Sequence, residues 1–284
     1  MSNAFRVCIV VPRGYRHSMC FVEAGFLLKH SLNSLGFTCD ITLNNLAHDR
    51  INIILGWHLM LYGDEWAPLR YIPYQLEQLS EASWSAFPDK RKMILAHALD
   101  VWDYSPENIA FLTSRGIASR HVPVGYHQSL EQIPQGCEKD IDVLFYGSMC
   151  ERRRAVLDIL SKDMGITVRS LFDVYGRDRD ECIARSRIIL NIHYYEAQIL
   201  EAIRISYLLN NRCFVVSEFS EINPYKAVKI PMFPYADIAD ACRRYLADRK
   251  EMDTMSEARH REFKENYPMK ELLKEALAPV NFYA

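Results

Sequence analysis

Short, unbroken apolar runs recur along the chain and constrain its fold more than any other feature. Examples are residues 7–11 (VCIVV) and 188–190 (IIL), which lack the polar alternation of a strand with one solvated face. Such runs are typical of strands buried on both faces, as in parallel sheets. Stretches with helical spacing separate them, such as residues 20–35 before Gly36. The alternation of strand and helix predicts an α/β fold.

A polar segment, residues 129–140, interrupts this pattern, which then restarts at residue 141. We therefore expect two Rossmann-like domains facing a central cleft, with boundaries of 1–135 and 136–284. Pro73 argues against a central position for the strand predicted over residues 71–76.

Charge and composition exclude several classes of protein. The net charge is −2, with 34 basic and 36 acidic residues, so we expect no nucleic-acid partner. The eight cysteines include no CxxC pair, which favours reduced thiols. The N-terminus has the pattern of a strand rather than of a signal peptide, and no apolar run approaches about 18 residues. The sequence predicts a cytoplasmic protein without a membrane span, and peripheral association with a membrane stays open.

The segment over residues 186–218 carries the strongest functional signal. A buried strand leads into the loop that holds His193, Tyr194 and Tyr195, and a helix over residues 197–209 precedes a second buried strand. Ligands bind at the carboxyl ends of parallel strands, and helix N-termini favour anions. We therefore expect these three side chains beside an anionic ligand, with the two tyrosines available to stack on a base.

Three motifs in this segment resemble a known family. They are Asn191 and His193 at the strand end, Glu201 followed by Ala202, and the strand 213–218 (CFVVSE). Together they resemble the C-terminal half of GT-B glycosyltransferases, in particular the spore-protein CgeB-like group. The resemblance implies a GT-B fold, a nucleotide-diphosphate sugar as co-substrate with UDP favoured, and a last helix that crosses back to the first domain.

The resemblance also assigns Glu201 to the ribose hydroxyls of the nucleotide. A carboxylate can accept hydrogen bonds from two vicinal hydroxyls, which suits this role. Retaining members of the family carry a second glutamate eight positions earlier, where this chain has His193. The stereochemical course of the reaction therefore stays open.

A second candidate region follows the predicted strand over residues 141–148. Gly147 and Ser148 form a turn in which the backbone can approach a ligand closely. Arg152 and Arg153 stand at the next helix start, where the helix dipole disfavours cations, so we expect them to bind an external diphosphate. Arg177 is a third, weaker element. The family neutralises the diphosphate with basic residues, and the chain has no convincing DxD motif, so we expect metal-independent chemistry and no cofactor.

The N-terminal half is expected to bind the acceptor: a glycan, a lipid, a protein or a small molecule. His58 and His17 are the favoured general bases for an inverting reaction, and Asp64, His97 and Asp103 are weaker candidates. GxGxxG and P-loop motifs are absent, which disfavours nicotinamide and P-loop chemistry. Two alternatives stay open: a sugar-nucleotide epimerase or hydrolase on the same fold, and a non-catalytic scaffold.

Overall fold

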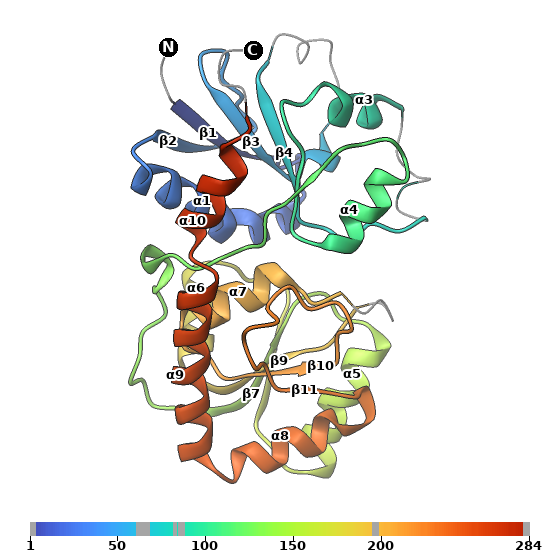
Figure 1. The fold of residues 1–284 in the computed structure, drawn as a ribbon. Coiled ribbons are helices and arrows are strands. Elements are labelled where there is room, and N and C mark those ends of the chain that lie inside the picture. The colour runs from blue at the N-terminus through green and yellow to red at the C-terminus, as the bar shows by residue number, and fades with distance from the viewer. Residues whose placement is uncertain (1–3, 61–68, 82–83, 85–88, 195–198, 281–284) are drawn as a thin grey trace. The chain divides into compact units, whose positions relative to one another are not determined.

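The computed structural model describes residues 4–60, 69–81, 84, 89–194 and 199–280, and the chain divides into two compact units. Unit 1 comprises Met1–Ser129 and Tyr267–Ala284, and unit 2 comprises Leu130–Asn266 (Figure 1). The division falls at residues 129 and 130 rather than at 135 and 136. The C-terminal segment groups with unit 1.

Unit 1 is built on parallel strands in the order β2-β1-β3-β4-β5-β6. The strands are β1 (Ala4–Ile9), β2 (Thr38–Leu43), β3 (Ile51–Leu55), β4 (Tyr71–Gln75), β5 (Trp102–Asp103) and β6 (Arg120–His121). The helices are α1 (Val22–Ser34), α3 (Asp89–His97), α4 (Pro106–Thr113) and α10 (Met269–Leu277), with short turns η1 (Arg16–Phe21), η2 (Trp57–Leu59) and η4 (Gln128–Leu130). Helix α1 packs on β1 and β2, and α10 packs on α1.

The expectation that Pro73 excludes a central strand is wrong. Strand β4 lies between β3 and β5, and Pro73 pairs with Ile54 of β3. Strand β5 pairs with β4 only at Tyr74 and Gln75, so Pro73 precedes that pairing. The missing N–H is tolerated because it falls where β4 has a strand neighbour on one side only.

Unit 2 contains a second parallel sheet, in the order β11-β10-β9-β7-β8. Its strands are β7 (Ile141–Tyr146), β8 (Val168–Leu171), β9 (Ser186–Asn191), β10 (Val215–Glu218) and β11 (Met232–Phe233). Its helices are α5 (Glu151–Asp158), α6 (Arg177–Ala184), α7 (Ala202–Asn210), α8 (Ile238–Leu246) and α9 (Arg249–Asn266), with turns η5 (Ile159–Asp163) and η6 (Tyr235–Asp237). The expected α/β class, with two parallel sheets and covering helices, is confirmed.

The core of unit 2 explains the unbroken apolar runs. Alternate residues of β7 and β9, such as Phe145 and Leu190, face a core that includes Leu157 of α5 and Ile238 of α8. Helix α7 lies on the opposite side of the sheet from α8 (Figure 1). Because helices cover both faces, nearly every residue of the central strands β9 and β10 is buried whichever way it points, and each large aliphatic side chain contributes about 1.5–3 kcal/mol.

The register of this sheet brings three strand ends to one edge. Leu144 of β7 pairs with Ile189 of β9, and Asn191 of β9 pairs with Ser217 of β10. The residues that follow β7, β9 and β10 therefore meet at the carboxyl edge of the sheet. Helix α7 begins there at Ala202, later than the predicted 197, because Ile199 forms a bridge with Ile222 and Glu201 is the N-cap.

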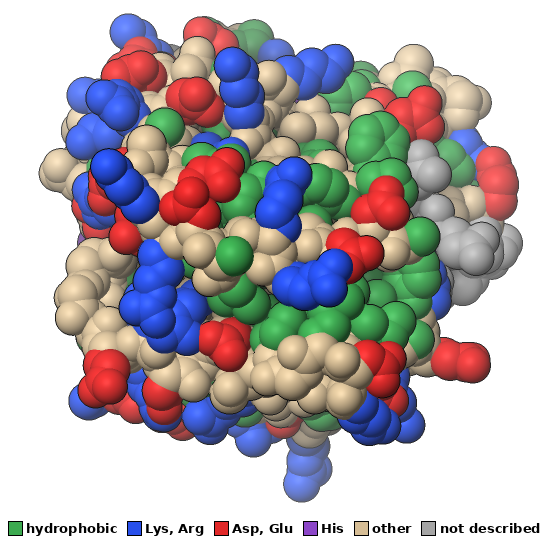
Figure 2. Space-filling view, turned by 90° about the horizontal axis from the view of Figure 1, so that it is seen from below, with side chains coloured by type: hydrophobic (Ala, Val, Ile, Leu, Met, Phe, Trp, Pro, Cys, Tyr) green, Lys and Arg blue, Asp and Glu red, His purple; other side chains and the backbone are tan. Residues whose placement is uncertain are grey.

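The surface charge and the helices bear on the predicted lack of a nucleic-acid partner and of a membrane span. The face of the molecule in Figure 2 intersperses Lys and Arg side chains with Asp and Glu, with apolar side chains between them. That face therefore presents no broad field of one sign. None of the helices in the described ranges is long and apolar enough to cross a membrane.

Candidate functional site

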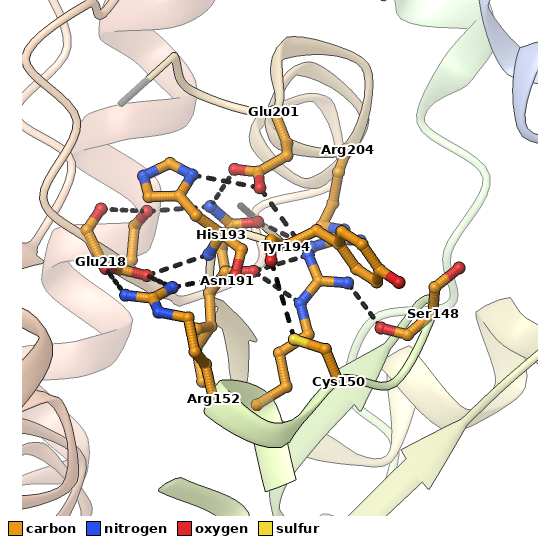
Figure 3. Close-up of polar contacts among 12 residues, drawn as sticks. Ser148, Cys150, Arg152, Asn191, His193, Tyr194, Glu201, Arg204 and Glu218 are labelled. Carbon is orange, nitrogen blue, oxygen red and sulfur yellow. Dashed lines mark hydrogen bonds and ion pairs between the residues drawn. The ribbon is translucent and has the colours of Figure 1, made fainter. Parts of the chain in front are cut away.

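A polar cluster occupies the carboxyl edge of the unit 2 sheet. Side chains from the ends of β9 and β10 and from the first turns of α5 and α7 converge there (Figure 3). Its members are Arg152, Arg153, Asn191, His193, Glu201, Arg204, Ser217, Glu218 and Ser220. Most of these side chains are buried, so their hydrogen bonds are protected from water and each one fixes the position of a neighbour.

Glu201 is the centre of this cluster. Its Oε2 accepts a hydrogen bond from Nδ2 of Asn191 at 2.7 Å, and its Oε1 lies 3.2 Å from Nδ1 of His193. The side chain keeps 22% of its surface exposed. Burial alone would raise the pKa of Glu201, but the hydrogen bond and charge of His193, helped by Arg204, lower it to about 2. Glu201 is therefore an ionised acceptor that is held in place and still reaches the surface.

Arg204 stands one turn after Glu201 on α7. Its Nη1 donates to Oδ1 of Asn191 at 2.7 Å, and its guanidinium lies 5.0 Å from the ring centre of Tyr146. Gly147 has a φ of +135°, and a Cβ at that position would lie 2.8 Å from Nη2 of Arg204. Glycine is thus required here both by the backbone conformation and by the close approach of the guanidinium. The structure brings Gly147 together with Arg204, which we did not single out from the sequence.

Arg152 and Arg153 have internal partners, which corrects the inference that the helix dipole leaves them to an external anion. Arg152 donates to both carboxylate oxygens of Glu218, at 3.1 and 2.5 Å, and this hydrogen bonding raises the pKa of its guanidinium. Arg153 is 3% exposed and donates to the carbonyl oxygens of Ile192 and Ser148, each at 2.6 Å at its shortest. Burial lowers the pKa of Arg153 to about 10, so it stays charged.

His193 is buried within the same cluster. Its ring contacts Glu201 through Nδ1, and its Nε2 lies 2.9 Å from Oγ of Ser220 and 3.2 Å from the carbonyl oxygen of Phe219. Its backbone N–H donates to Oε2 of Glu218 at 3.0 Å. Burial lowers the pKa of His193, but the hydrogen bond and charge of Glu201 outweigh burial, so the pKa lies above 6.5.

The other predicted donor-site residues are distributed unevenly. Tyr194 is 41% exposed, and the Arg153 guanidinium lies 5.3 Å from its ring centre. Ser148 contributes its backbone carbonyl to Arg153. Arg177 is at the start of α6, is 89% exposed and pairs with Glu181 at 2.9 Å, so it does not join the cluster. Tyr195 lies outside the described residues.

The candidate bases lie in unit 1. His17 is in η1 after β1, and His58 is in η2 after β3; these two strands are neighbours in a parallel sheet. Both histidines therefore follow strands at the carboxyl edge of that sheet. Asp103 is fully buried and binds the backbone N–H of Ser105 and Nδ2 of Asn108, which excludes it as a solvent-accessible base. Asp64 lies outside the described residues.

Sequence reasoning missed five members of the cluster as site residues. They are Asn191, Arg204, Ser217, Glu218 and Ser220. A signal existed for Arg204, because residues three apart share a helix face and Glu201 was already a candidate. Glu218 ends the strand that resembles the family, and Asn191 ends the preceding strand. The partnership of Glu218 with Arg152 of α5 joins residues 66 positions apart, which no local pattern reports.

Known proteins similar to this chain fall into two groups. No family model matches the chain. An uncharacterized protein of Acanthamoeba polyphaga mimivirus is 29% identical over 168 residues, which cover 55% of this chain and 54% of that protein. A second uncharacterized protein of the same virus is 30% identical over 143 residues, 48% of this chain and 19% of that protein. The chain thus spans about half of the first relative and less of the second.

Solved structures show the fold more completely. HepE from Anabaena, in complex with UDP and glucose, covers 98% of this chain and 100% of its own at a TM-score of 0.61 and 8% identity. The match to TarM covers 89% of this chain and 57% of the TarM chain, with a TM-score of 0.56 and 11% sequence identity. The match to a UDP-N-acetylglucosamine 2-epimerase covers 98% of this chain and 96% of that chain, with a TM-score of 0.53 and 10% sequence identity. The chain therefore has the two-unit α/β fold of GT-B proteins, as the sequence predicts.

Proposed function

We propose that the polar cluster of unit 2 binds a nucleotide-diphosphate sugar and that the chain transfers the sugar to a hydroxyl group of an acceptor. The observation that carries the proposal is the charge of the cluster. Among the described residues, three guanidinium groups of the cluster meet two carboxylates, which leaves one positive charge, and protonation of His193 adds a second. Excess positive charge held in a partly buried polar site attracts a diphosphate.

Each residue has a role in this proposal. Glu201 accepts from the two ribose hydroxyls, since its partly exposed carboxylate is ionised and already oriented. Arg204 contacts the diphosphate beside the Gly147 turn, where the backbone leaves room for it. Arg152 and Arg153 act through their charge while their N–H groups hold the cluster together. Tyr194 offers an exposed ring to the base.

UDP is the first nucleotide to test. The HepE structure contains UDP and glucose, and a TarM structure of Staphylococcus aureus contains UDP. In our proposal the diphosphate is neutralised by arginine rather than by a metal ion, so binding should persist in a chelator. Calorimetry with UDP, GDP, ADP, CMP and dTDP, each in EDTA, tests both points. Binding of one nucleotide supports the proposal, and binding of none contradicts it.

Turnover separates transfer from the alternatives. A glycosyltransferase consumes a UDP-sugar only when an acceptor is present, whereas an epimerase or hydrolase consumes it alone. Mass spectrometry of a UDP-sugar panel, with and without mixed glycan, lipid and alcohol acceptors, makes this distinction. Nucleotide binding without any turnover would indicate a non-catalytic scaffold.

The general base is tested in unit 1. If the reaction inverts configuration, His58 or His17 deprotonates the acceptor hydroxyl. We expect His58→Gln or His17→Gln to lower kcat about 100-fold or more with little change in UDP affinity. His48→Gln, at an exposed histidine between β2 and β3, is the matched control. Unchanged kcat in both variants would exclude these bases and favour a mechanism that needs none.

A further inference from the structure

The two ring nitrogens of His193 face oxygen atoms on opposite sides. Nδ1 lies 3.2 Å from Oε1 of Glu201, and Nε2 lies 3.2 Å from the carbonyl oxygen of Phe219 and 2.9 Å from Oγ of Ser220. An ionised carboxylate and a backbone carbonyl can only accept hydrogen bonds. A neutral imidazole carries one N–H; if that N–H faces Glu201, Nε2 can accept from Oγ of Ser220, but its lone pair still faces the carbonyl oxygen of Phe219. The doubly protonated ring donates to both sides.

The charged groups beside His193 come from α5, α7 and the end of β10. Helix α7 presents Glu201, and the end of β10 presents Glu218, whose Oε2 accepts the backbone N–H of His193. On α5, Arg152 donates to the His193 carbonyl at 3.1 Å and forms its ion pair with Glu218, while Arg153 lies 3.8 Å from Glu201. The cations of α5 are therefore engaged with carboxylates and carbonyl oxygens, and the ring itself faces acceptors.

We propose that His193 and Ser220 are positioning residues for Glu201: Ser220 fixes the ring at Nε2, and the imidazolium holds the Glu201 carboxylate toward the ligand. Asn191 holds the other carboxylate oxygen from the opposite side at 2.7 Å. Together these contacts leave Glu201 a single orientation. The ligand it receives, a nucleoside diphosphate, rests on the proposed function.

This arrangement links ligand binding to one proton. Loss of the His193 proton removes one positive charge from the cluster and weakens the attraction between the ring and Glu201. Affinity for UDP should therefore fall as pH rises through the pKa of His193, by at most tenfold per pH unit for one linked proton. The measurement belongs at pH 7–9, above the second phosphate ionisation of about 6, so that the charge of UDP is constant.

The charge of the ring can be measured without any nucleotide. The chain has nine histidines, so ¹⁵N-histidine labelling gives a small set of ring signals, and comparison with His193→Gln assigns one of them. We expect both His193 nitrogens to keep imidazolium shifts above pH 6.5, and the midpoint to fall in Ser220→Ala and in Glu201→Gln. Ser220→Thr keeps the hydroxyl and should restore the midpoint. A ring that titrates below 6.5, or a midpoint indifferent to Glu201→Gln, overturns the proposal.

Calorimetry then tests the consequence for binding. The affinity of the wild type for UDP should fall at least fivefold between pH 7 and 9. The affinity of His193→Gln for UDP should be low and should not change with pH. Ser220→Ala should shift the midpoint to lower pH, and Ser220→Thr should restore it. Flat affinity in a wild type that binds UDP overturns the positioning role and leaves the proposed function standing. If NMR shows the His193 imidazolium but calorimetry shows no binding of UDP, the proposed function and the role of His193 in ligand binding are overturned. The charge of the ring would still be established.

Discussion

His193 and Glu201 are eight residues apart in the sequence, and Nδ1 of the first lies 3.2 Å from Oε1 of the second. The contact joins the end of β9 to the N-cap of α7, so it connects a strand and a helix across residues 195–198, which lie outside the described part of the chain. This ion pair therefore holds the N-terminus of α7 against the end of β9, and it also contributes to the charge of the site.

The stability of this pair should depend on pH in a defined window. Folding raises the pKa of His193 above 6.5. The contribution of protonated His193 to the free energy of unfolding is therefore complete below about pH 6.5 and is lost as pH rises through the pKa of the folded state. Folding lowers the pKa of Glu201 from 4.5 to about 2, so that contribution is present above about 4.5 and is lost as pH falls toward 2. The pair stabilises the fold most between about pH 4.5 and 6.5.

Thermal denaturation from pH 4 to 9 checks this window. The difference in Tm between wild type and His193→Gln should be largest near pH 5.5 and should shrink above the folded pKa of His193. His97→Gln should follow the wild type throughout. A difference that grows with pH would show that the ring is neutral in the folded protein.

Removal of Arg152 should destabilise unit 2. Arg152→Met leaves Glu218, which is 8% exposed, without its bidentate partner, and we expect a loss of about 2–3 kcal/mol in the free energy of unfolding. The exposed pair of Arg177 and Glu181 is the matched control, and Arg177→Met should cost less than about 0.5 kcal/mol. Urea unfolding measures both. Equal losses would mean that the ion pair of Arg152 and Glu218 stabilises the fold no more than an exposed ion pair does.

Much of the fold can be predicted from the sequence because the central strands of a parallel sheet are rich in apolar residues. The apolar run 7–11 overlaps β1, the run 188–190 lies within β9, and the helical stretch 20–35 contains α1. The start of α7 could not be predicted, because the bridge between Ile199 and Ile222 depends on tertiary pairing that overrides local helical periodicity.

The site could be predicted only in part, for a related reason. Glu201, His193 and Gly147 stand at positions where strand ends and helix starts are visible in the sequence. The partners of Arg152 and Arg153 are a carboxylate 66 residues away and backbone carbonyl oxygens, and a carbonyl leaves no mark in a sequence. An arginine at a helix start therefore suggests an anion, whereas the structure supplies internal acceptors.

Substitution of Gly147 should separate ligand binding from backbone strain. Gly147→Ala places a Cβ 2.8 Å from Nη2 of Arg204 at a φ of +135°, so the arginine must move and UDP affinity should fall tenfold or more. Gly165→Ala also has a positive φ, +65°, with no atom within 4 Å of its Cβ. It should cost about 1 kcal/mol of stability and leave UDP affinity unchanged. Equal affinities of the two variants, measured by calorimetry, would contradict the role of the turn.

The C-terminal segment is fixed to unit 1 through Gly125. A Cβ at Gly125 would lie 2.4 Å from the carbonyl oxygen of Tyr267, and the N–H of Tyr126 donates to that oxygen at 2.7 Å. Gly125→Ala should therefore cost about 1–3 kcal/mol in urea unfolding. Gly25→Ala meets the flexible end of Ile41 and gains about 1 kcal/mol of helix propensity, so it should cost less. A larger loss for Gly25→Ala would contradict the tight contact at Gly125.

The central claim is that the cluster binds a nucleoside diphosphate, and calorimetry of UDP with wild type and Arg204→Met tests it most directly. Loss of one charged hydrogen-bond donor is worth about 1.5–3 kcal/mol, or roughly 10- to 150-fold in affinity. We predict that UDP binds the wild type and that Arg204→Met weakens it by that factor, while urea unfolding of the variant without ligand stays cooperative. A wild type that binds no nucleotide, or an Arg204→Met variant that binds UDP as tightly as the wild type, would contradict the claim.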